Sequence, residues 1–477
     1  MRTAVALMLA IGFLASAKAA PSSETAAPFE STEDFVAAEL RAAGAPGLAY
    51  VAVDNGAITA HAYGQVRAGG SEKVSPHTRF VIGSISKSFT ALAIMMLVEA
   101  GAVDLDGKVS QYLDVFQERP TGKITVRQLL SHTSGYSTKQ GNDTHTDETD
   151  NGDDLQRQVA QIAAWSPAHT PDARWQYSNA NYIILGVLIE RVSGETFASF
   201  IESKILDPLG MEQSFVADDG ATVTFAVGHQ PWFGGKRPFE YKRTARVTAP
   251  AGGVVSTASD LGLYLAMMLN DADDLISAKS KAAMMRPASA ASPFYGLGWY
   301  INTDNGDAYH GGLSPGIETR ATLSREENKG VVVLINANSG IGFGVNTALL
   351  YGVSAKALGR DFENRENLWG PRSLFLMFAI LPVLFVLGII RLGFDRQGLY
   401  AKTGAFGAFS LWFPVGITLA LAWTCWRLIP LLFGTPLNTL ALYQPDFVLT
   451  LIATAASGVI WAVLRIGLFY VGKPAGA

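Results

Sequence analysis

Three long runs of apolar residues dominate the C-terminal part of the chain. Residues 373–390, 403–426 and 447–464 contain no Asp, Glu, Lys or Arg. Each run is close to or longer than the ~18 residues that indicate a membrane-spanning helix. We therefore expect a three-helix transmembrane segment at 373–470, after a linker at 363–372 and before a tail at 471–477. A buried hairpin inside a larger soluble fold is the alternative interpretation.

Residues 20–362 show the shorter periodic patterns of one folded domain with helices and strands. Two strand-like stretches, "GLAYVAVD" and "AITAHAYGQV", are joined at Asn55-Gly56, a turn sequence that predicts a β-hairpin. Strand patterns at both ends of the domain with helical patterns between them predict an α+β fold, in which a helical half is inserted into a sheet. The expected helices are 33–43, 84–100, several within 126–204, 259–269 and 345–358, and the expected strands are 47–54, 57–66, 296–301, 320–325 and 330–338.

One stretch of the domain, residues 138–154, is polar and acidic and has no periodicity. Such a segment is typical of a mobile surface loop, and we expect it to be a lid. Its Asp residues lie around His145, but their spacing does not match a calcium-binding loop. We therefore expect no metal site.

The first residues of the chain predict export. Arg2 precedes an apolar run, and small residues follow it in an A-x-A pattern at 17–19. This arrangement predicts a secretory signal peptide at 1–19, with a retained membrane anchor as the alternative.

Basic residues between the apolar runs predict the orientation of the membrane segment. Arg391, Arg396 and Lys402 lie between the first two runs, whereas 434–446 contains no Lys or Arg. Basic loops favour the cytoplasmic side. We therefore expect a multi-pass protein of the cytoplasmic (inner) membrane, with the 20–362 domain on the periplasmic or extracellular side.

Composition narrows the range of functions. The 477 residues are 49% apolar and only 16% charged, which agrees with a membrane segment, and the net charge of -4 leaves no basic footprint for nucleic acid. The single cysteine, Cys425, excludes an internal disulfide and lies in an apolar run. Thiol catalysis in the 20–362 domain is therefore excluded.

Ser84 and Lys87 begin the predicted apolar helix at 84–100. Residues three apart share one face of a helix, so the hydroxyl and the amine should be neighbours. Burial would lower the pKa of Lys87, and a neutral amine can take the proton from a serine nucleophile. Free N–H groups at the helix start can stabilise a developing oxyanion. A serine N-cap followed by a surface lysine is the alternative interpretation.

Three motifs in order resemble those of the serine β-lactamase and penicillin-binding protein superfamily, in the branch related to class C β-lactamases. "SISK" at 84–87 resembles the first motif, "YSN" at 177–179 the Y-x-N motif, and "HGG" at 310–312 the K-T-G or H-x-G motif. The stretches "ITVRQLLSHTSGY", "AGGVVSTASDLGLYLAMML" and "YGLGWYI" also look typical of this branch. A second Y-x-N, Tyr300-Ile301-Asn302, lies on a predicted strand and is rejected as the catalytic copy.

The resemblance implies a β-lactamase/DD-peptidase-like fold, an antiparallel sheet flanked by helices beside an all-helical part. It implies that Ser84 is acylated and that Lys87 and Tyr177 share the proton transfers. It further implies that Asn179 binds substrate or orients Lys87, and that the oxyanion lies between the N–H groups of Ser84 and Leu313. Gly311 and Gly312 would let the substrate approach the strand, and this chemistry needs no cofactor. His132 is expected to be structural.

Position 310 departs from the β-lactamase pattern, which has lysine there. A histidine is mostly neutral near pH 7, so His310 should bind anions weakly and in a pH-dependent way. This favours a peptidase, D-amino-acid hydrolase or esterase that acts on a small-molecule or peptide substrate, with cell-wall peptides a natural class. The alternatives are a β-lactamase, a catalytically silent domain that binds peptidoglycan and signals, and a transport role for the membrane helices, which their few polar residues hardly support.

Overall fold

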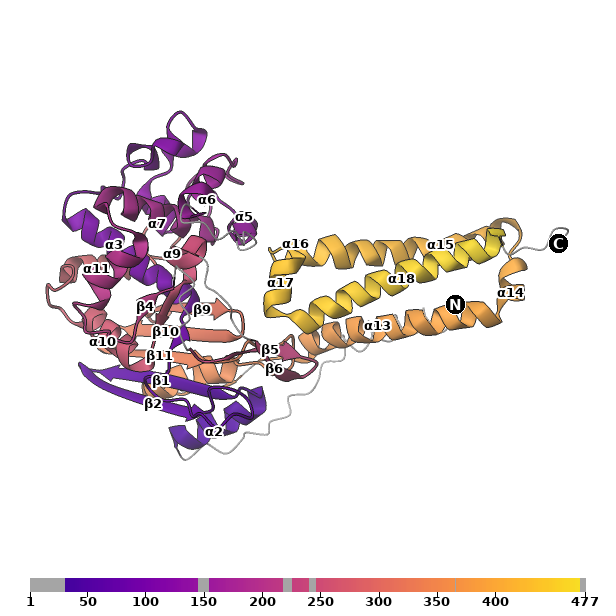
Figure 1. The fold of residues 1–477 in the computed structure, drawn as a ribbon, viewed down its shortest axis with the longest axis horizontal. Coiled ribbons are helices and arrows are strands. Elements are labelled where there is room, and N and C mark those ends of the chain that lie inside the picture. The colour runs from indigo at the N-terminus through magenta and orange to yellow at the C-terminus, as the bar shows by residue number, and fades with distance from the viewer. Residues whose placement is uncertain (1–30, 145–153, 218–224, 240–245, 365, 472–477) are drawn as a thin grey trace.

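A six-stranded antiparallel sheet forms the centre of the domain that precedes the apolar runs. The computed structural model describes residues 31–144, 154–217, 225–239, 246–364 and 366–471. The sheet has the order β2-β1-β11-β10-β9-β8, so strands from the two ends of the domain are paired in it (Figure 1). The strands are β1 (Gly47–Asp54), β2 (Ala57–Gly64), β8 (Tyr300–Ile301), β9 (Ala308–Ser314), β10 (Ile317–Ser324) and β11 (Lys329–Ile335).

Alternating apolar residues give this sheet two buried faces. Leu48 and Val333 belong to the core on one face, where α2 (Thr32–Ala43) and α12 (Val353–Ala357) pack. Residues of the opposite register join the larger core, where α10 (Ala258–Leu269) packs on β1, β2 and β11. The expected sheet with helices on its flanks is confirmed.

The helical part lies on the side of this larger core (Figure 1). Its principal helix, α3 (Ser86–Glu99), is buried almost all round, as its continuous apolar sequence predicts. The other helices are α4 (Val126–Leu130), α5 (Thr138–Asp143), α6 (Asp154–Ala163), α7 (Asn179–Ser193), α8 (Phe197–Ile201), α9 (Ala249–Gly252) and α11 (Ala278–Met284). Short strands add a three-stranded sheet, β3 (Phe80–Val81), β7 (Val254–Ser256) and β4 (Phe215–Val216), and a hairpin, β5 (Gly228–Trp232) and β6 (Gly235–Phe239).

Several expected boundaries differ in the structure. Ser84 lies in a 3₁₀ turn, η1 (Gly83–Ile85), and the α-helix begins only at Ser86. The expected lid is helical at its beginning, because Ser137 and Gln140 form a capping box that starts α5, while 145–153 lies outside the described residues. The helix expected at 345–358 consists of a π-helical turn, η8 (Ala348–Gly352), followed directly by α12.

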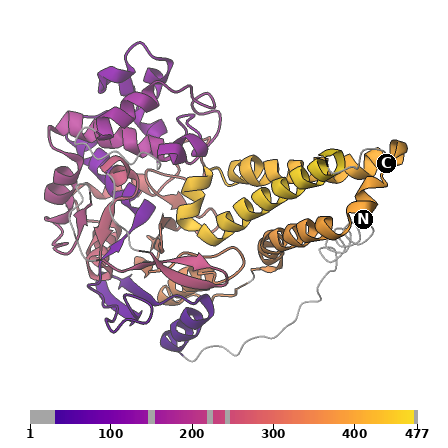
Figure 2. The same ribbon diagram turned by 45° about the vertical axis from the view of Figure 1, so that its right-hand side comes forward.

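Three helices are long and apolar enough to cross a membrane: Trp369–Phe394, Gly404–Leu432 and Pro445–Val471. The first is α13, the second joins α15 (Gly404–Trp423) to α16 (Ile429–Leu432), and the third is α18. They form an elongated bundle that extends away from the domain (Figures 1 and 2). The stretch expected as a linker, 363–372, is already helical from Trp369. The three long apolar helices are connected by two short helices, α14 (Arg396–Tyr400) and α17 (Leu437–Tyr443).

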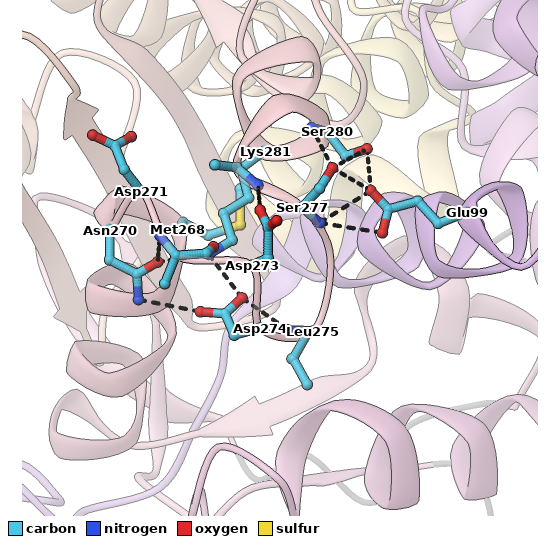
Figure 3. A network of polar contacts seen from close by, with 12 residues as sticks. Glu99, Met268, Asn270, Asp271, Asp273, Asp274, Leu275, Ser277, Ser280 and Lys281 are labelled. Carbon is cyan, nitrogen blue, oxygen red and sulfur yellow. Dashed lines mark hydrogen bonds and ion pairs between the residues drawn. The ribbon is translucent and has the colours of Figure 1, made fainter.

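Lys87 and Lys281 are fully buried lysines of the domain, and their surroundings differ. Lys281 Nζ lies 2.7 Å from Asp274 Oδ1 and donates to Asn270 Oδ1 and to the Ala272 carbonyl, in the polar network of Figure 3. Lys87 has no carboxylate within 4.0 Å among the described residues. Burying an amine without an ionic partner disfavours its charged form, so Lys87 is not explained by structural pairing.

Candidate active site

A cavity of about 300 Å³ lies where η1 and the start of α7 meet β9. It contains residues of all three expected motifs, although these motifs are far apart in the sequence. The lining residues are Ser84, Tyr177, Tyr300, His310, Gly311, Gly312, Leu313, Glu318, Thr319, Arg320, Leu350 and Tyr351.

Ser84 is held against the backbone of β9. The preceding residue, Gly83, has φ +56°, and a Cβ there would lie only 2.7 Å from the Leu313 nitrogen. Glycine is therefore required both for this conformation and for the close approach. The Thr319 hydroxyl donates to the Ile82 carbonyl at 2.8 Å and ties the same turn to β10. The N–H groups of Ser84 and Leu313, which are expected to form an oxyanion hole, therefore belong to two segments that are in contact. The side chain of Leu313 is exposed.

Lys87 lies one helical turn beyond Ser84 and contacts it directly. Its Nζ is 3.0 Å from Ser84 Oγ and donates to the Ala251 carbonyl at 2.7 Å. Burial lowers the pKa of Lys87 well below the usual value of 10.5. A neutral Lys87 can accept the Ser84 hydroxyl proton across the same contact.

Tyr177 stands beside this pair, just before α7. Lys87 Nζ lies 5.0 Å from the centre of its ring, and His132 packs on that ring with 4.3 Å between ring centres. Burial raises the pKa of Tyr177 well above 10, and the Ser84 hydroxyl only partly opposes this. Tyr177 is therefore a neutral phenol near pH 7, suited to donating a proton, whereas Lys87 is the better base.

His132 is buried and supports the Y-x-N motif. Its Nδ1 accepts from the Ser178 backbone N–H at 3.2 Å and lies 3.0 Å from Asn181 Nδ2. These contacts fit the structural role expected for His132.

Asn179 does not contact Lys87 by a hydrogen bond in the part of the chain that the structure describes. Its Nδ2 donates instead to Asn142 Oδ1 at 3.3 Å, on α5. The structure therefore does not show a hydrogen bond that orients Lys87, and Asn179 is not among the lining residues of the cavity.

His310 lines the cavity, but its environment changes the expected role. Its Nδ1 is 2.7 Å from the Gly311 carbonyl and its Nε2 is 3.2 Å from the Tyr295 hydroxyl. Burial, followed by the nearby charge of Lys87, lowers its pKa to about 3. His310 is thus neutral throughout the physiological range, and the expected pH-dependent anion contact near pH 6.5 does not fit this site.

Arg320 supplies a positive charge that the sequence interpretation missed. Its guanidinium is stacked between the rings of Tyr309, at 4.4 Å, and Tyr351, at 4.2 Å. Asp307 interacts with this charge electrostatically, but no ion pair within 4.0 Å forms among the described residues, and the buried Nε has no hydrogen-bond partner there. β10 pairs with β9 so that Arg320 is opposite Gly311, which has no side chain to separate it from the cavity. In "IETRATLS" Arg320 lies on the polar face of the strand with Glu318 and Thr322, so the sequence pattern gave no signal that set it apart.

Comparison with known proteins agrees with this geometry. The family model described as β-lactamase matches residues 32–355. Protein flp of Staphylococcus aureus strain MRSA252 is 25% identical over 85% of this chain and 83% of its own length. Penicillin-binding protein 4* of Bacillus subtilis strain 168 is 29% identical over 58% of this chain and 64% of its own length.

Among solved structures, the octameric penicillin-binding protein homologue from Pyrococcus abyssi is similar, with a TM-score of 0.60. It is 26% identical, and the match covers 73% of this chain and 81% of that one. The family match covers well over half of the 477 residues. The chain therefore belongs to the β-lactamase family of serine hydrolases, which includes penicillin-binding proteins, and has its β-lactamase/DD-peptidase fold.

Proposed function

We propose that this protein is a membrane-anchored serine hydrolase that works through an acyl-serine intermediate on peptide, amide or ester substrates. The contact between Ser84 Oγ and Lys87 Nζ carries the proposal. It joins a serine that lines a cavity to a buried amine whose pKa is lowered and which has no ionic partner among the described residues. Perturbed amines of this kind are typical of catalytic sites.

The proposed reaction has two halves. Lys87 takes the Ser84 hydroxyl proton as Oγ attacks the substrate carbonyl, and the N–H groups of Ser84 and Leu313 stabilise the oxyanion. Tyr177 then donates its phenol proton to the leaving group as the bond to that group breaks. The protonated Lys87 returns a proton to Tyr177 and becomes neutral again. Water then attacks the acyl group with the same residues acting in reverse, and releases the acid and free Ser84.

Arg320 supports a narrower choice of substrate. A guanidinium held between two aromatic rings presents its N–H edge in a fixed plane, which suits bidentate binding of a carboxylate. Since Arg320 and Ser84 line one cavity, we propose substrates that carry a free carboxylate near the reacting carbonyl. Peptides with a free C-terminus and the corresponding esters belong to this class.

Two matched esters that differ only in a free carboxylate test both the function and the substrate class. The purified full-length protein should hydrolyse both, and mass spectrometry of the quenched reaction should detect one acyl group per chain. Arg320→Met should lower kcat/KM for the anionic ester about 10- to 100-fold, mainly through KM, and leave the neutral ester within about twofold. Arg237→Met is the matched control, because that guanidinium stacks on Trp232 and is not a lining residue of the cavity.

Absence of both turnover and acylation would favour the catalytically silent alternative. Equal losses on both esters with Arg320→Met would mean that Arg320 supports the cavity but binds no anion.

We further propose that the hydrolase domain lies outside the cytoplasm. The absence of Lys and Arg at 434–446, against Arg391, Arg396 and Lys402 in the other loop, supports this orientation. A reporter that works only outside the cytoplasm should be active when fused after Leu358 or Asn438. It should be silent after Gln397 or Ala477, and the reverse pattern would contradict the orientation.

A further inference from the structure

The membrane segment contacts the hydrolase domain through a connection that we call the docking loop, residues 433–446. It runs from the end of α16 through α17 to the start of α18, and it lies at the end of the bundle beside α5 and β5 (Figure 1). Aromatic residues from both sides share one apolar core there, among them Phe343, Phe375 and Phe447. The polar contacts are Gln230 Nε2 to Leu442 O at 2.6 Å, Gln444 Nε2 to Ser339 O at 2.7 Å, Phe233 N to Asp446 Oδ2 at 2.8 Å and Asn142 Nδ2 to Gly434 O at 2.9 Å.

The last of these contacts leads into the candidate active site. Asn142 donates its Nδ2 to the Gly434 carbonyl, and its Oδ1 accepts from Asn179 Nδ2 at 3.3 Å. Two amide side chains therefore connect the docking loop to the Y-x-N motif.

The chemistry of the groups gives this connection a direction. A backbone carbonyl only accepts, so Gly434 requires Asn142 to present its NH₂ group. The carbonyl end of Asn142 then faces Asn179, which must present its own NH₂ group in turn. This leaves Oδ1 as the end of the Asn179 amide without a hydrogen bond to the described residues. Without the Gly434 carbonyl, the amide groups of Asn142 and Asn179 could both rotate by half a turn, so that the C=O and NH₂ groups of each change places.

The backbone of α5 is pressed against the same motif. A Cβ at Gly141 would lie 2.4 Å from the Asn179 nitrogen and 2.7 Å from Ser178 Oγ. On the other side of α5, a Cβ at Gly434 would lie 3.8 Å from the Thr138 side chain. There is little room for α5 to move independently of the motif, so its position between docking loop and site is well defined.

We propose that the docking loop orients the Asn179 amide through Asn142, so that the membrane segment forms part of the support of the active site. This inference rests on the proposed function. Asn142 is a positioning residue, because it acts on substrate only through Asn179. The substrates affected are those with an amide N–H next to the reacting carbonyl.

The test uses the full-length protein in detergent or in lipid nanodiscs. Asn142→Ala should lower kcat/KM about 10-fold for an ester that carries an acylamino group, with most of the loss in kcat. The rate of labelling by a small fluorophosphonate, which offers no amide, should stay within about twofold. Asn179→Ala should lower turnover of the same ester, and the double variant should be no slower than Asn179→Ala alone.

Asn142→Asp examines the contact with the docking loop. The carboxylate has only acceptor oxygens, so it holds the Asn179 amide in the same orientation without the contact to Gly434, and we expect turnover within about twofold of wild type. Lys139→Ala, an exposed change on α5, is the matched control and should leave both rates unchanged. A loss in Asn142→Asp as large as in Asn142→Ala, or additive losses in the double variant, would overturn the proposal. Failure of fluorophosphonate labelling in the unmodified protein would instead contradict the proposed function.

Discussion

Ser84→Ala is expected to abolish covalent labelling by a fluorophosphonate and to lower ester turnover by at least about 10³-fold. The variant removes the only atom that the proposed mechanism acylates and leaves no charge unpaired. Ser84 is at the edge of the cavity, in a short 3₁₀ turn, so the loss of its hydroxyl should not unfold the domain. In-gel fluorescence and intact mass measure the adduct, and a thermal melt checks the fold.

Ser203→Ala is the control for Ser84→Ala, because Ser203 is an exposed serine outside the cavity. It should label as the unmodified protein does. Labelling that persists in Ser84→Ala, mapped to another serine, would show that the nucleophile has been assigned wrongly.

Lys87→Met is expected to lower kcat/KM for a neutral ester by about 10²- to 10⁴-fold, the range attributed to a general base. Lys87→Arg should be equally impaired, because a guanidinium keeps the positive charge but cannot be deprotonated in a protein. If Lys87 served only through its charge, the arginine variant would retain most of the activity. This pair of variants therefore separates proton transfer from electrostatic stabilisation.

The pH profile of the unmodified protein gives a second measure of Lys87. The amine must be neutral to act as base, so kcat/KM should rise as pH increases through its pKa and then level off. Because burial lowers that pKa well below 10.5, the plateau should be reached at a lower pH than for a lysine in water. The pKa of His310 is about 3, so His310 should add no limb near neutrality. A midpoint close to 10.5 would contradict the role of Lys87.

The sequence was sufficient for those parts of the site that depend on local motifs. Ser84 and Lys87 are three residues apart, and their contact follows from one helical turn. The three long apolar helices were predictable because long uncharged runs have few other structural solutions. The helix–strand order likewise predicted the sheet with a helical part.

Other parts of the site depend on contacts between segments that are distant in the sequence. These contacts are known only from the folded structure. Arg320 reaches the cavity only because β10 pairs with β9 in a register that places it opposite Gly311. The pKa of His310 depends on how deeply the residue is buried, and Asn142 contacts Gly434, a residue more than 290 positions later in the sequence. The beginning of the acidic stretch is helical because Ser137 and Gln140 form a capping box, whereas the expected lid at 145–153 lies outside the described residues and stays a prediction.

The pairing of β1 with β11 has a consequence for biosynthesis. Tyr50 pairs with Val333, so the central ladder joins residues 283 positions apart (333 − 50). Until β11 has been made, the β1–β2 hairpin exposes an unpaired edge, and closing so long a loop is slow. The first of the three long apolar helices begins at Trp369, only 34 residues after β11 ends at Ile335 (369 − 335). The sheet can therefore close only when synthesis has nearly reached that helix, so completion of the domain and synthesis of the three apolar helices follow each other closely.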